Sequence, residues 1–273
     1  KKDTSLLHHL IGSRSLVWNL AKNDIKKKFA GSYFGVVWAF VQPVITVLLY
    51  WFVFEKGLNS KATDLRTGIE IPFVLWLTAG LVPWFYFQEA LNGGTGVLVE
   101  YSYLVKKVVF QIDMLPVVKM ISALFTHLFF VAFTIVLFIC MGYMPDWYAL
   151  QVVYYSFCMI LFATGLVYAT SAVTVFFRDM KEVVGILLQI GMWVTPIMWN
   201  FETMVQIPGW AITVLKLNPM YYIVSGYRNA LINHIGFWED MGLTVYFWVV
   251  TAVILFLGTT VFKRLRPQFA DVL

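Results

Sequence analysis

Charged residues are scarce in this sequence. Only 13% of its 273 residues are Asp, Glu, Lys or Arg, whereas 60% are hydrophobic and the mean hydropathy is +0.76. An ordinary soluble domain carries roughly 25% charged residues, so the surplus of apolar side chains requires contact with lipid. The scarcity of charge therefore argues against a soluble globular protein and predicts an integral membrane protein.

Several motifs that carry chemistry are missing as well. Cysteine occurs only at Cys140 and Cys158, each within an apolar run, which gives no support to a disulfide framework or a Cys/His metal site. The sequence has no Gly-x4-Gly-Lys-Ser/Thr phosphate loop, no Gly-x-Ser-x-Gly nucleophile elbow and no His-Glu-x-x-His motif. We therefore expect no catalytic residue, no metal and no cofactor in this chain.

Six apolar stretches are long enough to cross a bilayer, which takes about 20 residues in a helix. They are 35–54, 71–88, 120–141, 147–177, 183–201 and 241–262. The predicted fold class is thus an all-α integral membrane protein, with six transmembrane helices in a domain at 33–265. A segment at 1–32 precedes this domain and a cytoplasmic tail at 266–273 follows it.

The distribution of Lys and Arg predicts the orientation of these helices. Fifteen of the 20 basic residues lie in the first segment, the second and fourth connections and the tail, and five lie on the other side. Basic residues near helix ends are retained in the cytoplasm, so we expect both termini and the turn at Arg178 and Asp179 to be cytoplasmic. The net charge of +5 then needs no nucleic acid to explain it.

The segment before the first crossing has a helical pattern of its own. Trp18, Ala21, Ile25 and Phe29 recur at three- and four-residue steps among polar residues. This spacing predicts an amphipathic helix that lies on the inner leaflet. The alternative is a helical arm of a cytosolic subdomain, for which about 30 residues are too few.

The segment between the fifth and sixth crossings, 202–240, is interrupted by Pro and Gly. It is too apolar for a free loop and too interrupted for one more crossing. Irregular backbone at membrane depth is stable where protein or a water-filled cavity surrounds it. We therefore predict two short re-entrant helices, and a compact external cap is the alternative.

Two ionisable side chains lie within predicted crossings. Glu89 continues the second crossing, where an ionised acid costs about 2.5–3.5 kcal/mol, so it should face the bundle interior, water or the interface. His127 lies midway along the third crossing, where a hydrogen bond to a neighbouring helix is the simplest explanation. The two residues leave open a gradient-driven secondary transporter and an intramembrane enzyme on lipid-linked sugars.

The second connection, 100–116, combines aromatic residues with a Lys106–Lys107 pair. A short helix parallel to the membrane, ended at Pro116, would present Tyr101, Tyr103 and Leu104 to a soluble partner. A basic loop that rests on anionic lipid explains the lysine pair equally well.

Aromatic residues make up 18% of the chain, and many of them belong to the two interfacial belts of a membrane protein. Their clusters are more numerous than two belts require. Aromatic rings with hydroxyl groups offer apolar contact together with hydrogen bonds, which suits a path for a polyhydroxylated chain. The candidate path residues are Trp84, Tyr86, Glu89, Tyr154, Tyr155, Tyr221 and Tyr222.

Several stretches of the chain resemble one family. They are the basic amphipathic segment, GVVWAFVQPVITVLLYWFVF, PFVLWLTAGLVPWFYF, FFRDMKEV, TPIMW, LNPMYYIVSGYRNAL and FKRLRPQFADVL, which together cover nearly the whole chain. In this order they resemble the membrane (permease) subunit of type-2 ABC exporters of cell-envelope polysaccharide. Within the family, YWFVF, PFVLW, AGLVPWF and NPMYYIVSGYR look closest to the teichoic acid translocation permease. O-antigen and capsular polysaccharide exporters share most of these patterns.

The resemblance implies a homodimer of the six-helix subunit, with two copies of a separate ABC ATPase that binds ATP and Mg. It also implies a dimer interface between the first and fifth crossings, and a lipid-linked polysaccharide substrate that enters beside the amphipathic helix. The expected activity is export of lipid-linked wall teichoic acid, or a similar polymer, across the cytoplasmic membrane. The expected ATPase coupling helix contains Tyr101, Tyr103, Leu104, Lys106 and Lys107.

Overall fold

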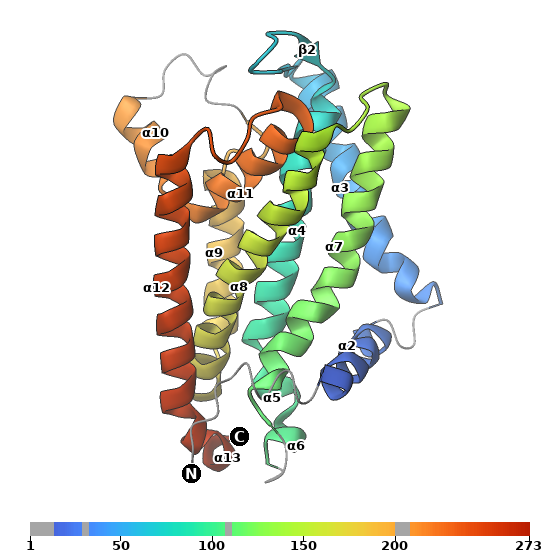
Figure 1. Cartoon of the computed structure of the whole chain (residues 1–273). Helices are drawn as coiled ribbons and strands as arrows, with labels where there is room; N and C mark the ends of the chain where they lie inside the picture. Colours follow the sequence, from blue (N-terminus) through green and yellow to red (C-terminus); the bar gives the residue numbers. More distant parts are fainter. Residues whose placement is uncertain (1–13, 29–32, 107–110, 200–207) are drawn as a thin grey trace.

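The computed structural model describes residues 14–28, 33–106, 111–199 and 208–273. Long helices stand side by side in one bundle (Figure 1). They are α3 (Trp38–Trp51), α4 (Phe73–Thr95), α7 (Met114–Cys140), α8 (Gln151–Phe176), α9 (Met180–Val194) and α12 (Met241–Leu265).

Shorter elements lie at the two ends of the bundle (Figure 1). The short α-helices are α2 (Arg14–Lys28), α5 (Val97–Glu100), α6 (Ser102–Val105), α10 (Gly209–Lys216), α11 (Pro219–Arg228) and α13 (Phe269–Val272). The 3-10 helices are η1 (Gly35–Val37), η3 (Trp147–Leu150) and η6 (Arg266–Gln268), and the π-helices are η2 (Phe52–Gly57) and η5 (Asn229–Asn233). Strands β1 (Ala62–Thr63) and β2 (Glu70–Ile71) pair antiparallel, with Ala62 opposite Ile71.

Four helical stretches in the described ranges are long and apolar enough to cross a membrane. They are Trp38–Gly57, Met114–Cys140, Trp147–Phe176 and Met241–Val272. Helices α4 and α9 stand in the same bundle at the places of the second and fifth predicted crossings (Figure 1). The last turns of α4 are polar, and α9 has only 15 residues, so the count of six crossings stays a prediction.

Two prolines lie at other positions relative to the helix ends than predicted. Pro116, which we expected to end a helix, lies in the first turn of α7. A proline is tolerated there because the first N–H groups of a helix have no intrahelical partner. Pro196, which we expected inside the fifth crossing, lies beyond the end of α9 at Val194. Proline disfavours the helical conformation in the residue before it, and Thr195 is accordingly extended.

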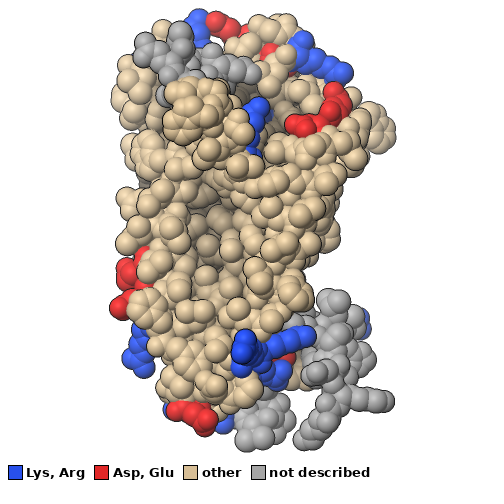
Figure 2. Space-filling model, turned by 90° about the vertical axis from the view of Figure 1, so that its left-hand side faces the viewer, with Lys and Arg blue, Asp and Glu red and all other residues tan. Residues whose placement is uncertain are grey.

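The bundle has one end that is rich in Lys and Arg. Helices α2, α5, α6 and α13 lie at this end together with the carboxyl terminus (Figure 1), and we refer to it as the basic end. Figure 2 shows charged residues toward both ends of one face, with a broad uncharged band between them. Such a band suits the hydrocarbon layer, where charged side chains are costly.

Helix α2 packs against α7. Its buried residues are Val17, Ala21 and Asp24, and the first two form an apolar cluster with Met114 and Val118 of α7. Trp18, which we predicted on the face that meets the inner leaflet, is 45% exposed. The contact of that face with the leaflet stays a prediction, and Phe29 lies outside the described residues.

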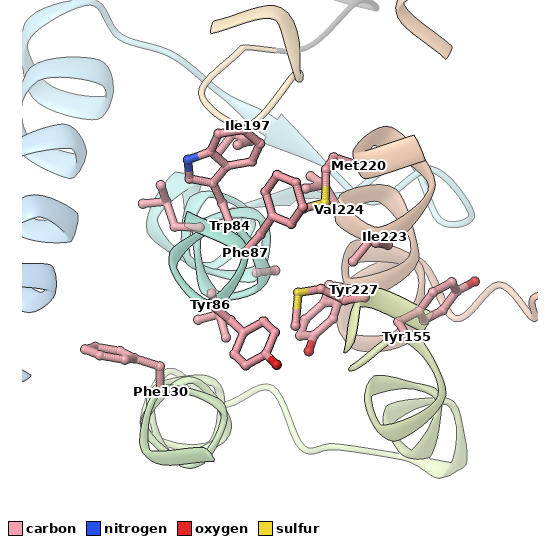
Figure 3. Close-up of a cluster of buried hydrophobic side chains, with 14 of the residues drawn as sticks. Trp84, Tyr86, Phe87, Phe130, Tyr155, Ile197, Met220, Ile223, Val224 and Tyr227 are labelled. Atoms are coloured by element: carbon pink, nitrogen blue, oxygen red, sulfur yellow. The ribbon is translucent and has the colours of Figure 1, made fainter. Parts of the chain in front are cut away.

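Two short helices, α10 and α11, lie between α9 and α12, where two were predicted. Asn218 begins α11: its side chain accepts a 3.0 Å hydrogen bond from the Met220 N–H, and Pro219 occupies the first turn. Helix α11 is largely buried, and Figure 3 shows Ile223 and Tyr227 among the side chains of the core. The depth of these helices in a bilayer stays a prediction.

Candidate functional site

A cavity of about 870 Å³ lies beside α2, between α3, α4 and α7. Its α3 wall combines apolar residues such as Trp38, Phe40 and Pro43 with the polar Gln42 and Thr46. Its α4 wall is polar and includes Gln88, Glu89 and Asn92. The cavity can therefore hold a molecule with one apolar part and one polar part.

Lysine side chains gather at the polar part of the cavity. Two of them lie against glycines: a Cβ on Gly93 would be 3.6 Å from Cδ of Lys119, and one on Gly96 would be 3.8 Å from Cδ of Lys181. The lining includes four lysines and three acids, namely Lys27, Lys28, Lys119 and Lys181 with Asp24, Glu89 and Glu100. The four lysines outnumber the three acids by one, so the lining has a formal net charge of +1.

Glu89, the acid expected within the second crossing, is paired with Lys28 at the end of α2. The distance from Lys28 Nζ to Glu89 Oε1 is 2.6 Å, and the two side chains are 52% and 26% exposed. Both residues line the cavity. Glu89 thus faces a polar cavity rather than lipid.

Asp24 joins α2 to α7 and to the segment at Tyr101. Its Oδ1 accepts hydrogen bonds from the Tyr101 hydroxyl at 2.7 Å and from Lys119 Nζ at 2.6 Å, and its Oδ2 accepts one from Ser122 Oγ at 2.8 Å. Lys119 also lies 2.9 Å from Glu100. Burial alone would raise the pKa of Asp24, but Lys119 and the two hydroxyls outweigh it and lower that pKa below its ordinary value. Asp24 is therefore an ionised, fully bonded carboxylate.

Tyr101 is buried, which differs from the prediction that it faces a soluble partner. Only 3% of the residue is exposed, and the ammonium groups of Lys27 and Lys119 lie 5.2 and 5.5 Å from its ring centre. Burial and the bond to Asp24 raise the pKa of the Tyr101 hydroxyl. Tyr101 therefore connects α2 to the segment that follows α5 and is not available to a partner.

The rest of the predicted coupling segment is more accessible. Tyr103 is 53% exposed and Lys106 is exposed, whereas Leu104 is half-buried. Lys107 lies outside the described residues. The expected cytoplasmic turn, Arg178 and Asp179, is also exposed.

Most of the predicted path residues lie in the core of the chain. Trp84, Tyr86 and Tyr155 are each 2% exposed, and Figure 3 shows them among the packed side chains of α4, α8 and α11. Tyr222 is 4% exposed, and its hydroxyl lies 3.0 Å from that of the half-buried Tyr154. The hydroxyls of Tyr154 and Tyr222 thus join α8 to α11. A role of these five residues in a path stays a prediction. Of the other two candidates, Glu89 lines the cavity and Tyr221 is half-buried.

His127 makes the expected hydrogen bonds to neighbouring helices. Its Nε2 lies 3.1 Å from the Tyr227 hydroxyl of α11 and 3.2 Å from Ser156 Oγ of α8. The residue is 2% exposed and does not line the cavity. This geometry supports a role in packing rather than in proton transfer.

Sequence reasoning missed the residues that attach α2, chiefly Asp24 and Lys119. A signal was present, because Asp24 follows Val17 and Ala21 at helical spacing and so shares their buried face. Sequence reasoning also did not predict that Arg228, counted among the cations of the opposite side, is buried to 6% exposure.

The fold and the cavity define a class: a multi-pass helical membrane protein with a cavity beside the short helix α2 at the basic end. Residues 15–232 match the family described as ABC-2 type transporter, and the chain belongs to that family. It is similar to the O-antigen export system permease protein RfbA of Myxococcus xanthus, with 25% identity over 97% of this chain and 98% of that protein. Two proteins of the same name from Klebsiella pneumoniae are 21% identical to it over 93% of either chain.

The comparisons confirm the resemblance at the level of the transporter family. The similar proteins described above are permeases of O-antigen export. The finer resemblance to the teichoic acid translocation permease stays a prediction.

Proposed function

We propose that this chain is the permease subunit of an ATP-driven exporter of a lipid-linked cell-envelope polysaccharide. Family membership and similarity along almost the full length of O-antigen export permeases support this function. Because those relatives are named for O-antigen export, a polymer of that class is better supported than wall teichoic acid.

The observation that carries the proposal is the cavity at the basic end. A lipid-linked polysaccharide combines a long apolar chain with a phosphate group and a polar glycan. The α3 wall offers apolar contact to the lipid, and the lysines offer charge-assisted hydrogen bonds to phosphate. In this proposal α2 lies on the inner leaflet, and the cavity beside it is where a lipid-linked molecule of that leaflet would enter.

The energy would come from a separate ABC ATPase, since this chain has no phosphate-binding loop. That partner would bind ATP and Mg and would dock at the basic end, where Tyr103, Lys106 and the turn at Arg178 are exposed. The hydrogen bond between Tyr101 and Asp24 would then transmit movement of the docking segment to α2.

The functional unit would be a homodimer of this chain with two ATPase subunits. Only 6% of the Trp38–Gly57 span is buried within the chain, against 56% of the Trp147–Phe176 span. Ile45, Leu48 and Phe52 of this span are about half exposed or more, as are Ile186 and Ile190 of α9. These two apolar faces are the proposed interface between the copies.

The proposed topology has six crossings with the basic end in the cytoplasm, following the retention of Lys and Arg on that side. In this topology α10 and α11 enter the outer leaflet from outside. Their position between α9 and α12 at the opposite end supports this assignment (Figure 1).

The test is reconstitution of the permease with its ATPase in liposomes. We expect export of a lipid-linked O-antigen-type glycan that requires ATP and ceases when the ATPase is inactivated in its phosphate loop. Transport that continues without ATP and follows a proton gradient would instead identify a secondary transporter. Chemical conversion of the lipid-linked sugar by this chain alone would identify an enzyme.

A further inference from the structure

The basic end contains two ion pairs that differ in burial. In the first pair, Lys119 and Asp24 are only 12% and 7% exposed, and Asp24 has two further hydrogen bonds. In the second pair, Lys28 and Glu89 are 52% and 26% exposed. Solvated ion pairs contribute little net stability. The first pair is therefore a fixed attachment, whereas the second can exchange partners.

The Lys28–Glu89 pair connects two walls of the cavity. Lys28 ends α2, and Glu89 lies on α4. Lys27 of the same turn lies over the rings of Tyr101 and Tyr103, at 5.2 and 5.9 Å from their centres. The pair with Glu89 adds a contact to α4 at this end of the helix.

We propose that Glu89 is an internal anion that occupies Lys28 until the phosphate of a lipid-borne substrate replaces it. This inference rests on the proposed function and assigns a role to Glu89. A phosphate offers several strong acceptor oxygens and binds lysine by charge. Lys181, which also lines the cavity, supplies a second cation on the α9 side. The exchange breaks the ion pair that joins α2 to α4.

The proposed exchange makes the site selective for the headgroup. A neutral lipid can contact the apolar residues of α3 but cannot compete for Lys28. It therefore leaves the Lys28–Glu89 ion pair intact. Free phosphate competes for Lys28 but gains nothing from the apolar wall. Tight binding therefore requires a lipid tail and a phosphate in one molecule.

The experiment measures binding to the permease–ATPase complex in phosphatidylcholine nanodiscs. The probes are a fluorescent polyprenyl phosphate, the matching polyprenol and inorganic phosphate. Glu89→Gln removes the competing charge and keeps the shape, and we expect it to tighten polyprenyl phosphate binding up to about fivefold. Binding of the polyprenol should not change, and Lys28→Gln should weaken binding of the phosphate probe.

The double variant with Lys28→Gln and Glu89→Gln tests whether Glu89 acts through Lys28. We expect it to bind polyprenyl phosphate no better than Lys28→Gln alone. The matched control is Glu70→Gln, which breaks another exposed pair, Lys61–Glu70 at 2.7 Å, far from the cavity. This control should bind all three probes as the wild type does.

Three results would overturn the inference: unchanged or weaker phosphate-probe binding in Glu89→Gln, equal tightening for the polyprenol, or a double variant that matches Glu89→Gln. Inorganic phosphate that displaces the probe at a concentration near the Kd of the probe would identify free phosphate, not a headgroup, as the ligand. ATP-dependent export by the same variants, measured in proteoliposomes, separates the two proposals. If export occurs but Glu89→Gln does not tighten binding, only the role of Glu89 is rejected. If binding tightens but no protein exports, the wild type included, the exporter is rejected.

Discussion

The guanidinium of Arg228 lies 3.2 Å from the ring centre of Trp76. Its Nη1 and Nη2 donate hydrogen bonds to the carbonyls of Pro196 and Ile197 at 2.6 and 2.7 Å, and its Nε donates to the Trp76 carbonyl at 3.3 Å. Pro196 and Ile197 follow the end of α9, where backbone carbonyls lack helical partners. One buried side chain thus joins α11, α4 and the segment after α9.

Replacement of Arg228 by lysine should destabilise the permease. A single ammonium cannot reproduce the planar set of donors or the stacking on Trp76, so buried carbonyls lose their partners. We expect a loss of about 2–4 kcal/mol, measured by thermal unfolding in detergent. Arg264→Lys, on the exposed end of α12, is the control and should change stability by less than about 0.5 kcal/mol.

Gly80 provides an independent check of the Arg228 position. A Cβ on Gly80 would lie 2.6 Å from Nη2 of Arg228. Gly80→Ala should therefore displace the guanidinium and lower the unfolding temperature in the same direction as Arg228→Lys. If both variants melt like the wild type, the buried guanidinium does not hold these segments together.

The buried carboxylate of Asp24 should be required for coupling. Asp24→Asn removes the charge that balances Lys119, so we expect a stability loss of about 1–3 kcal/mol and reduced export for each ATP hydrolysed. Ser122→Ala removes one hydroxyl only and should have a smaller effect. Export and hydrolysis are measured on the same proteoliposomes, and an unchanged ratio in Asp24→Asn would contradict the role.

The attachment of α2 to α7 should weaken with pH only at acidic pH. The folded pKa of Asp24 is below the ordinary 3.8, so its stabilising contribution is complete above about pH 3.8 and is lost as pH falls through the folded pKa. An attached α2 resists proteolysis. We therefore expect slow trypsin cleavage at Lys26 and Lys27 at neutral pH, with the rate expressed relative to that of a reference substrate. Asp24→Asn should be cleaved faster at neutral pH, because it lacks the carboxylate at every pH.

The residues proposed to dock the ATPase should be replaceable without a loss of stability. Tyr103 and Lys106 are exposed, so Tyr103→Ala together with Lys106→Glu should weaken association with the ATPase without a change in unfolding temperature. Tyr101→Ala, at a buried position, should lower the unfolding temperature instead. Co-purification and thermal unfolding distinguish the two effects. Normal association in the double variant would reject this surface.

The sequence predicted the helical stretches well because lipid imposes a simple rule of length and apolarity on them. Met241, for example, was predicted as the start of the last crossing, and α12 begins there with Asp240 as its cap. Helix ends near prolines were less predictable, because Pro116 begins a helix while Pro196 follows the end of another.

The site was harder to predict than the fold because its residues come together from distant parts of the chain. Asp24 and Lys119 lie 95 positions apart, and their pairing depends on how α2 packs on α7. The hydroxyls of Tyr154 and Tyr222 also have their partners on other helices, which spacing within one helix does not reveal.

The orientation of the basic end is open to a direct test by cysteine labelling. Tyr103 is 53% exposed at the basic end, and Met144 is 72% exposed in the connection between α7 and α8 at the opposite end. Native Cys140 is exposed and Cys158 is buried, so Cys140→Ser gives a suitable background. In intact cells, a membrane-impermeant maleimide should label Met144→Cys and should reach Tyr103→Cys only after the membrane is opened. The reverse pattern would place the proposed docking segment outside the cell, where an ATPase has no ATP, and would rule out the exporter proposed for this chain.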